Sequence, residues 1–366
     1  MENPVEKRMS TVNRRSFLRT GLVAGGAATA AAIGGGVLAS AVPARAQSYG
    51  RRGRLNSGDA AILRFLAAAE LIETDLWIQY AELGGVAAPG NGYQTALENL
   101  DGDGPQYITS NTLDEQSHAD FINAYLSWRG AEPVNLDAFR TLPGSTAAGS
   151  SGKKRLTNLM HLNVDTSWYT RYRSAQNPDF GATFPQAIKL SNVKAIPATD
   201  ADTTNADHAQ VIANTAAFHF GFIEQGGSSL YAVMSQKVTD PEVLAITLGI
   251  GGDEIAHFLE WVDFAGNGVQ PPVAPVTDPN TKLTFPDFTN PPNPSLQPNL
   301  IFPVPCEFIS PQLPKVAIIR PLTDRFGGAV AAAESLTADG LFDGQSNKFL
   351  QTLSELAMEA DEAFRR

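Results

Sequence analysis

Glu115-Gln-Ser-His118 and Glu254-Ile-Ala-His257 are two copies of one four-residue pattern, and each lies in a stretch with helical spacing of apolar residues. Residues three apart on a helix share a face, so the carboxylate and the imidazole of each pair can reach one metal ion. A single Glu-x-x-His pair is typical of a solvated surface contact. Two such pairs on separate predicted helices indicate a shared site.

Two further predicted helices each place acidic residues within an apolar face. The helix expected over 59–83 carries Glu70 and Glu73, and the helix expected over 202–235 carries Glu224. The order Glu, Glu-x-x-His, Glu, Glu-x-x-His along the chain is the ligand set of di-iron and di-manganese carboxylate bundles. Four carboxylates neutralise two divalent cations and two imidazoles add neutral ligands, whereas four buried carboxylates without a metal would be costly.

The sequence therefore predicts a centre of two iron or two manganese ions, between which glutamate and histidine do not discriminate. The predicted ligands are Glu115, His118, Glu224, Glu254 and His257, with either Glu70 or Glu73 from the first helix.

Five stretches around these residues carry a resemblance to a known family. They are 69–77, 114–118, 222–224 with Tyr231, 253–257, and 162–173. Together they resemble the ferritin-like domain proteins that include the plant desiccation-related proteins and their secreted bacterial relatives, over roughly residues 59–264. The resemblance implies an all-α fold, a ferritin-like four-helix bundle with a long crossover between helices two and three. It also favours Glu70 over Glu73 as the ligand from the first helix.

The first 46 residues are typical of a twin-arginine signal peptide. Arg14-Arg15 is followed by Phe17-Leu18, then by an uncharged run over 20–44 and an Ala-Arg-Ala cleavage site at 44–46. The alternative is a membrane anchor, because the run is long enough to span a bilayer. The signal predicts the twin-arginine export machinery and a signal peptidase as partners, and a periplasmic or extracellular location.

The rest of the chain divides by composition. We expect a linker at 47–58, a bundle at 59–265 interrupted by an insert at 130–201, a Pro-rich arm at 266–325 and a C-terminal helical tail at 326–366. The arm is expected to be extended and to pack on the bundle, because 14 of the 24 prolines lie between 271 and 321. Other helices are expected over 105–128, 153–173 and 241–264, and a turn over 84–92.

Composition limits the possible functions. The formal net charge of −11 argues against a nucleic-acid partner, and a single cysteine, Cys306, excludes an intrachain disulfide and a cysteine metal cluster. We expect an exported oxidoreductase, a ferroxidase or catalase-like protein that acts on O2, peroxide or Fe(II) in oxidative or desiccation stress. The alternative is a non-catalytic stress-protective protein. An iron-storage cage is disfavoured, because the crossover and the arm would cover surfaces that a cage must bury.

A few other residues have two interpretations each. Tyr80 and Tyr231 are either redox-active residues beside the metals or core packing, and packing is favoured. His161, His208 and His219 lack ligand spacing and are interpreted as surface or packing residues.

Overall fold

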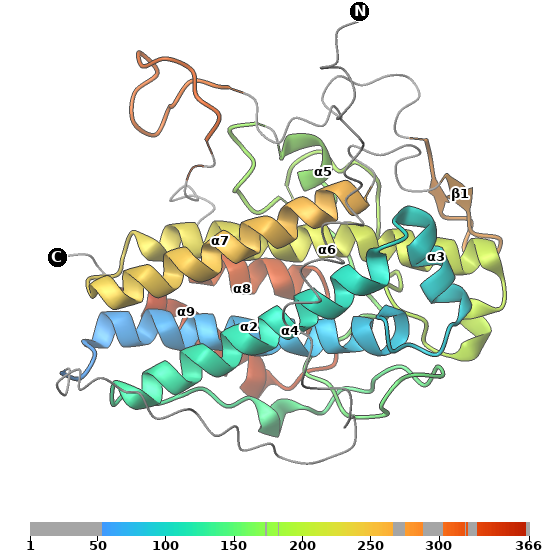
Figure 1. Ribbon diagram of the computed structural model, residues 1–366, viewed down its shortest axis with the longest axis horizontal. Helices are drawn as coiled ribbons and strands as arrows, with labels where there is room; N and C mark the ends of the chain where they lie inside the picture. The colour runs from blue at the N-terminus through green and yellow to red at the C-terminus, as the bar shows by residue number, and fades with distance from the viewer. Residues whose placement is uncertain are drawn as a thin grey trace, which may run out of the picture. The chain divides into compact units, whose positions relative to one another are not determined.

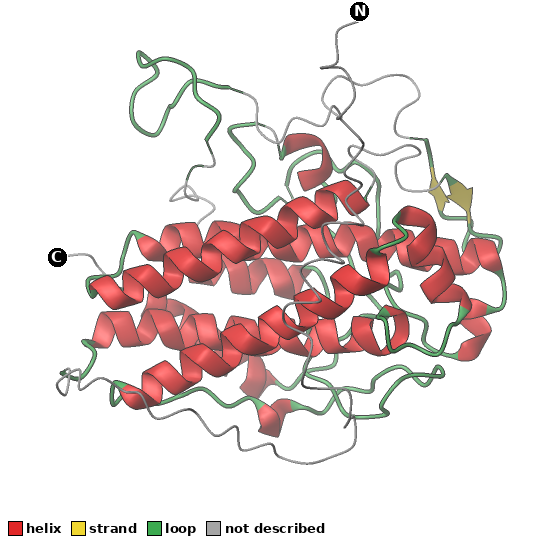
Figure 2. Cartoon of the chain, in the orientation of Figure 1, coloured by secondary structure: helices red, strands yellow, loops and turns green. Residues whose placement is uncertain are grey.

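The computed structural model describes residues 53–172, 174–181, 183–265, 275–287, 303–318, 320 and 328–363. Over these residues the regular secondary structure is almost all helical, which is consistent with the all-α prediction, and Figure 2 shows one small pair of strands beside the helices. The predicted signal peptide at 1–46 and the linker up to residue 52 lie outside the described residues. None of the described helices combines the length and the apolar character that crossing a bilayer requires.

Four long helices pack alongside one another (Figure 1). They are α2 (Ser57–Gly84), α4 (Gly104–Trp128), α6 (Ala206–Ser235) and α7 (Pro241–Phe264). Helix α2 packs against α4, α6 packs against α7, and α4 also contacts α7. The four helices predicted from apolar periodicity are therefore confirmed, with ends within a few residues of the expected ones.

Local capping explains where these helices begin. The side chain of Asn56 accepts a hydrogen bond from the backbone N–H of Asp59, and Asp240 caps α7 with Pro241 in its first turn. Asp59 is itself buried and accepts hydrogen bonds from the backbone N–H groups of Thr239 and Asp240. The starts of α2 and α7 are therefore held together, which helps to fix the register of the two helices, both of which carry predicted metal ligands.

The connection between α4 and α6 is mostly irregular, and the helix expected over 153–173 is wrong. Among the described residues of that range only α5 (Trp168–Arg171) is helical, and the 3-10 turns η1 (Asp137–Phe139) and η2 (Asp200–Thr203) lie elsewhere in the connection. The backbone N–H groups of Leu156 and Thr157 donate to the buried carboxylate of Asp75 on α2, and Leu162 pairs with Val193. In an α-helix these amides would donate to the carbonyl oxygens four residues earlier. Here they donate to groups far away in the sequence, so no helix forms.

One short helix was not expected. Helix α3 (Gly92–Leu100) follows the predicted turn, begins at the capping side chain of Asn91 and packs against α6. The phenolic O–H of its buried Tyr93 donates to the backbone oxygen of Ala195, at 2.8 Å.

The C-terminal third adds a hairpin and two helices. Strands β1 (Val276–Thr277) and β2 (Thr284–Phe285) pair antiparallel and contact α6, and much of the remaining Pro-rich arm lies outside the described residues. The expected tail is two helices, α8 (Ala329–Ala338) and α9 (Asn347–Asp361), of which α9 packs on α2. The segment between α8 and α9 contains Gly340 and Gly344, whose φ angles of 83° and 90° favour glycine.

Candidate metal centre

The six residues favoured as ligands come together between the four long helices. All are buried: Glu70 on α2, Glu115 and His118 on α4, Glu224 on α6, and Glu254 and His257 on α7. They form two groups in which one ligand atom from each residue lies within 4.8 Å of the others. The first group is Glu70, Glu115, His118 and Glu254, and the second is Glu115, Glu224, Glu254 and His257.

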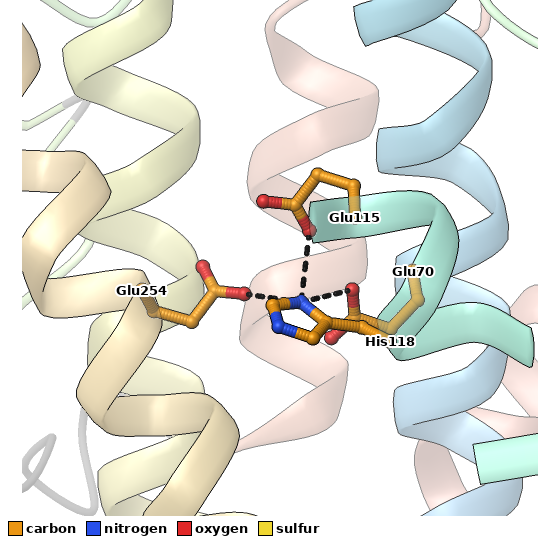
Figure 3. A group of neighbouring side chains, drawn as sticks. All are labelled: Glu70, Glu115, His118 and Glu254. Carbon is orange, nitrogen blue, oxygen red and sulfur yellow. Dashed lines mark hydrogen bonds and ion pairs between the residues drawn. The ribbon is translucent and has the colours of Figure 1, made fainter. Parts of the chain in front are cut away.

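Two carboxylates, those of Glu115 and Glu254, belong to both groups, and each group adds one histidine and one further glutamate. In the first group, Nδ1 of His118 lies 3.4 Å from oxygens of Glu70 and Glu115 and 3.8 Å from Glu254 (Figure 3). In the second group, Nδ1 of His257 lies 3.0 Å from Glu115. Both Nδ1 atoms therefore face the carboxylates.

Glu73, the alternative to Glu70, is buried near the cluster but belongs to neither group. Its Oε2 accepts no hydrogen bond from the described part of the chain. Burial raises the pKa of Glu73 well above its ordinary value, and the charges of Glu115 and Glu70 add to the effect. The structure thus places Glu70 among the grouped ligand atoms and leaves Glu73 beside them.

The cluster is short of positive charge. Within the described residues, neither oxygen of Glu254 accepts a hydrogen bond, nor does Oε2 of Glu70 or of Glu224. Burial raises the pKa of Glu254 well above its ordinary value, with Glu115 adding to the shift, and burial raises the pKa of Glu70 to about 7. Buried carboxylates in this state need protons or cations as partners.

The two histidines carry protons when no other cation is present. Burial works to lower the pKa of His118, but the neighbouring carboxylates of Glu115 and Glu70 outweigh burial and raise the pKa to about 10. Burial works to lower the pKa of His257 as well, but the charge of Glu224 and the hydrogen bonds that His257 donates to the carboxylates of Asp114 and Glu115 outweigh it and raise the pKa. Divalent cations could replace these protons, because the ligand atoms already converge.

Each histidine also contacts, through its Nε2 atom, an aspartate carboxylate on the other Glu-x-x-His helix. Nε2 of His118 lies 3.1 Å from Asp253 on α7, and Nε2 of His257 lies 3.4 Å from Asp114 on α4. A carboxylate on Nε2 holds the proton there and leaves Nδ1 free as a ligand. Sequence reasoning assigned these aspartates no role, although each directly precedes the glutamate of a Glu-x-x-His pair.

Two other residues that shape the cluster were also missed. The amide of Asn111 donates to Glu115 at 2.9 Å and to Glu224 at 3.1 Å, and its oxygen accepts from the indole N–H of Trp261. A Cβ atom at Gly227 on α6 would lie 2.0 Å from Oε2 of Glu254, so only glycine leaves room for this carboxylate. The sequence does contain a signal for this close approach, because a Gly-Gly pair at 226–227 is unusual inside a long predicted helix.

The other histidines lie outside both groups. His161 is exposed, whereas His208 is buried between Asp202 and Asp278, and His219 is fully buried. No family model, curated protein or solved structure matches the chain. The observation that bears on function is therefore the cluster itself, a buried set of carboxylates and imidazoles that is compatible with metal binding.

Proposed function

We propose that this chain is a ferritin-like protein with a two-metal carboxylate centre. The observation that carries the proposal is the sharing of Glu115 and Glu254 by two groups of ligand atoms. Two cations close together repel each other, and carboxylates between them reduce that repulsion. Each position then has one imidazole and one glutamate of its own, Glu70 with His118 and Glu224 with His257.

The unpartnered carboxylate oxygens support this assignment. Both oxygens of Glu254 are buried and accept no hydrogen bond within the described residues, an arrangement that metal ligation satisfies and a protein core does not favour. Glutamate and histidine are ligands that suit iron and manganese alike. A bound pair of these ions would supply one-electron redox chemistry toward O2, peroxide or Fe(II).

The surrounding residues position the ligands. Asp253 and Asp114 orient the two imidazoles, and the phenol of Tyr231 donates a hydrogen bond to Glu70. Zero exposure of Glu115 and Glu254 excludes bulk water from the shared carboxylates, which strengthens every charge interaction there.

The proposed activity is that of an exported redox protein, a ferroxidase or a catalase-like scavenger that acts in oxidative or desiccation stress. The depth of the site favours a second candidate, a stress-protective protein whose metals are structural. All six ligands are buried, and closed sites are typical of structural metals.

Metal analysis with turnover assays separates the two candidates. Protein purified after export is analysed for iron and manganese, then assayed for peroxide breakdown and Fe(II) oxidation. Two ions per chain with turnover support the redox protein, and tightly held ions without turnover support the structural role.

A double variant tests the centre itself. Glu115→Ala with Glu254→Ala should abolish metal loading, whereas Glu98→Ala, an exposed glutamate on α3, should leave it unchanged. Full metal content in the double variant would contradict the proposal.

A further inference from the structure

A cavity of about 790 Å³ opens beside the first turns of α6. Its lining comes from segments that are distant in the sequence: the start of α6, the 3-10 turn η2, other parts of the α4–α6 connection, and the loop of the β1–β2 hairpin. Ile212 in this lining precedes the proposed ligand Glu224 by twelve residues on α6, which corresponds to roughly 18 Å along a helix. The cavity is therefore separate from the proposed metal centre, and its volume is in the range of sites that bind small molecules.

Part of the lining is apolar. Val211 and Ile212 on α6 are 4 % and 2 % exposed. Three further apolar side chains, those of Met160, Val193 and Leu283, are half-buried. The carbon body of a small molecule loses exposed apolar area against such a surface, whereas a hydrated ion gains nothing from it. The apolar lining therefore favours an organic ligand over an inorganic ion.

The same cavity gathers lysines in an acidic chain. Lysine occurs nine times in the sequence, whose net charge is −11, and Lys189, Lys194 and Lys282 all line the cavity. The ammonium of Lys194 lies 2.9 Å from both oxygens of Asp202, so its charge is matched. Lys189 and Lys282 form no ion pair with any described residue, and Lys282 donates instead to the backbone oxygen of Pro279. Two positive charges therefore remain for an anionic ligand.

The two aspartates of the lining are occupied by other groups of the protein. Nε2 of the buried His208 lies 3.2 Å from Asp202, and its Nδ1 lies 2.9 Å from Asp278. Asp278 also accepts hydrogen bonds from the hydroxyl of Thr281 and the backbone N–H of Asn280. These contacts hold the hairpin loop to α6 and η2, so the walls of the cavity have a fixed arrangement before any ligand enters.

Two residues of the lining have an unusual backbone. Among the described residues, Asn192 and Lys282 are the non-glycine residues with positive φ, at 52° and 65°, and both line this cavity. Asparagine adopts this conformation readily, whereas a lysine disfavours it. Position 282 lies at the end of the hairpin loop, where turn chemistry alone favours glycine or asparagine. A lysine held in this strained backbone indicates a role for its side chain.

We propose that the cavity binds a small carboxylic acid in its anionic form, with the apolar body of the molecule against α6. The ammonium groups of Lys189 and Lys282 hold the carboxylate, whose two oxygens each accept a charge-assisted hydrogen bond. The carbon chain or ring of the ligand contacts Val211, Ile212 and Leu283. The proposal concerns binding alone and does not depend on the metals.

The test of ligand class uses the purified full chain, with octanoate as the probe. Binding is measured by displacement of the fluorescent anion 8-anilinonaphthalene-1-sulfonate. We expect octanoate to displace the dye, and the neutral 1-octanol to be about tenfold weaker because it lacks the charge-assisted contacts. Acetate and inorganic phosphate, which have no apolar body, should leave the dye bound. The proposal is overturned if octanoate displaces no dye, or if 1-octanol or phosphate displaces it as effectively as octanoate.

The test of the site uses Lys282→Gly, which removes the charge and also relieves the backbone. Glycine adopts a φ of 65° without strain, so this variant should not melt at a lower temperature than wild type. Its affinity for octanoate should fall by about fivefold, and that of Lys189→Gln with Lys282→Gly on the order of twentyfold. A lysine with no role beyond the turn would leave the affinity unchanged in Lys282→Gly.

Lys348→Gln is the matched control, because it removes the charge of an exposed lysine in the first turn of α9. It should bind octanoate as wild type does, and Lys282→Arg, which keeps the charge, should bind within twofold of wild type. Wild-type affinity in the double variant, or an equal loss in Lys348→Gln, would show that octanoate binds elsewhere and would overturn the assignment of this cavity.

Discussion

Gly227→Ala tests the proposed metal centre without removing any of the proposed ligands. A Cβ at this position would lie 2.0 Å from Oε2 and 2.8 Å from Cδ of Glu254, so the carboxylate must leave its place. Gly226, the preceding residue on α6, is the matched control. A Cβ there meets only the edge of the Phe180 ring, at 3.4 Å.

The two substitutions should differ by about 1 kcal/mol in stability and strongly in metal binding. Both gain about 1 kcal/mol of helix propensity over glycine. Gly227→Ala is also destabilised by overpacking, which costs about 1–3 kcal/mol. We expect the low end of this range, because the new methyl group overlaps the flexible end of the Glu254 side chain. The shared carboxylate of Glu254 is displaced from both groups, so metal affinity should fall by more than the roughly 10–100-fold typical of losing an outer partner.

The assay combines metal counting with urea unfolding. Chelator-treated proteins are loaded anaerobically with Fe(II) or Mn(II), desalted and analysed for metal per chain. Wild type and Gly226→Ala should retain two ions per chain, and Gly227→Ala fewer than one. Equal loading and affinity in the two variants, with both folded, would refute the idea that Glu254 must occupy this position.

Three further predictions concern the surroundings of the site and the effect of pH. Asp253→Asn should lower metal affinity by about 10–100-fold in a chelator competition, because the carboxylate that orients His118 is lost. The control Asp120→Asn, at an exposed position on α4, should leave the affinity unchanged. Equal affinities of the two variants would contradict the orienting role of Asp253. In metal-free protein, the pKa of Glu70 is raised from 4.5 to about 7 and that of His118 from 6.5 to about 10, so the folded state binds more protons than the unfolded state. Its melting temperature should therefore fall as the pH rises from 5 to 10, and metal should suppress this fall; a pH-independent melting temperature of the apoprotein would be inconsistent with the charge balance described. For Asp278, burial acts to raise the pKa, but hydrogen bonds from neighbouring groups outweigh it and lower the pKa below 3.8. Its contribution to stability is present above pH 3.8 and is lost as the pH falls through the folded-state value, so Asp278→Asn should show a smaller loss of melting temperature below pH 4 than wild type.

Local patterns made the four long helices and the ligand spacing predictable. Apolar periodicity and capping residues such as Asp240 act within a few residues, and the Glu-x-x-His spacing follows from helix geometry alone. The irregular run over 153–167 could not be predicted, because the buried Asp75, far away in the sequence, accepts hydrogen bonds from the amides of Leu156 and Thr157. The roles of Asn111 and Gly227 depend likewise on which helices face each other, which periodicity does not reveal.

The crossed pairing of aspartates and histidines links the metal centre to the assembly of the molecule. Helix α4 holds the imidazole of α7 through Asp114, and α7 holds that of α4 through Asp253. Sliding one helix past the other by a single turn, about 5.4 Å, would break both pairs at once. Only chains with the correct helix register would then present both imidazoles to the carboxylates, so uptake of cations by the proposed centre would report on correct folding.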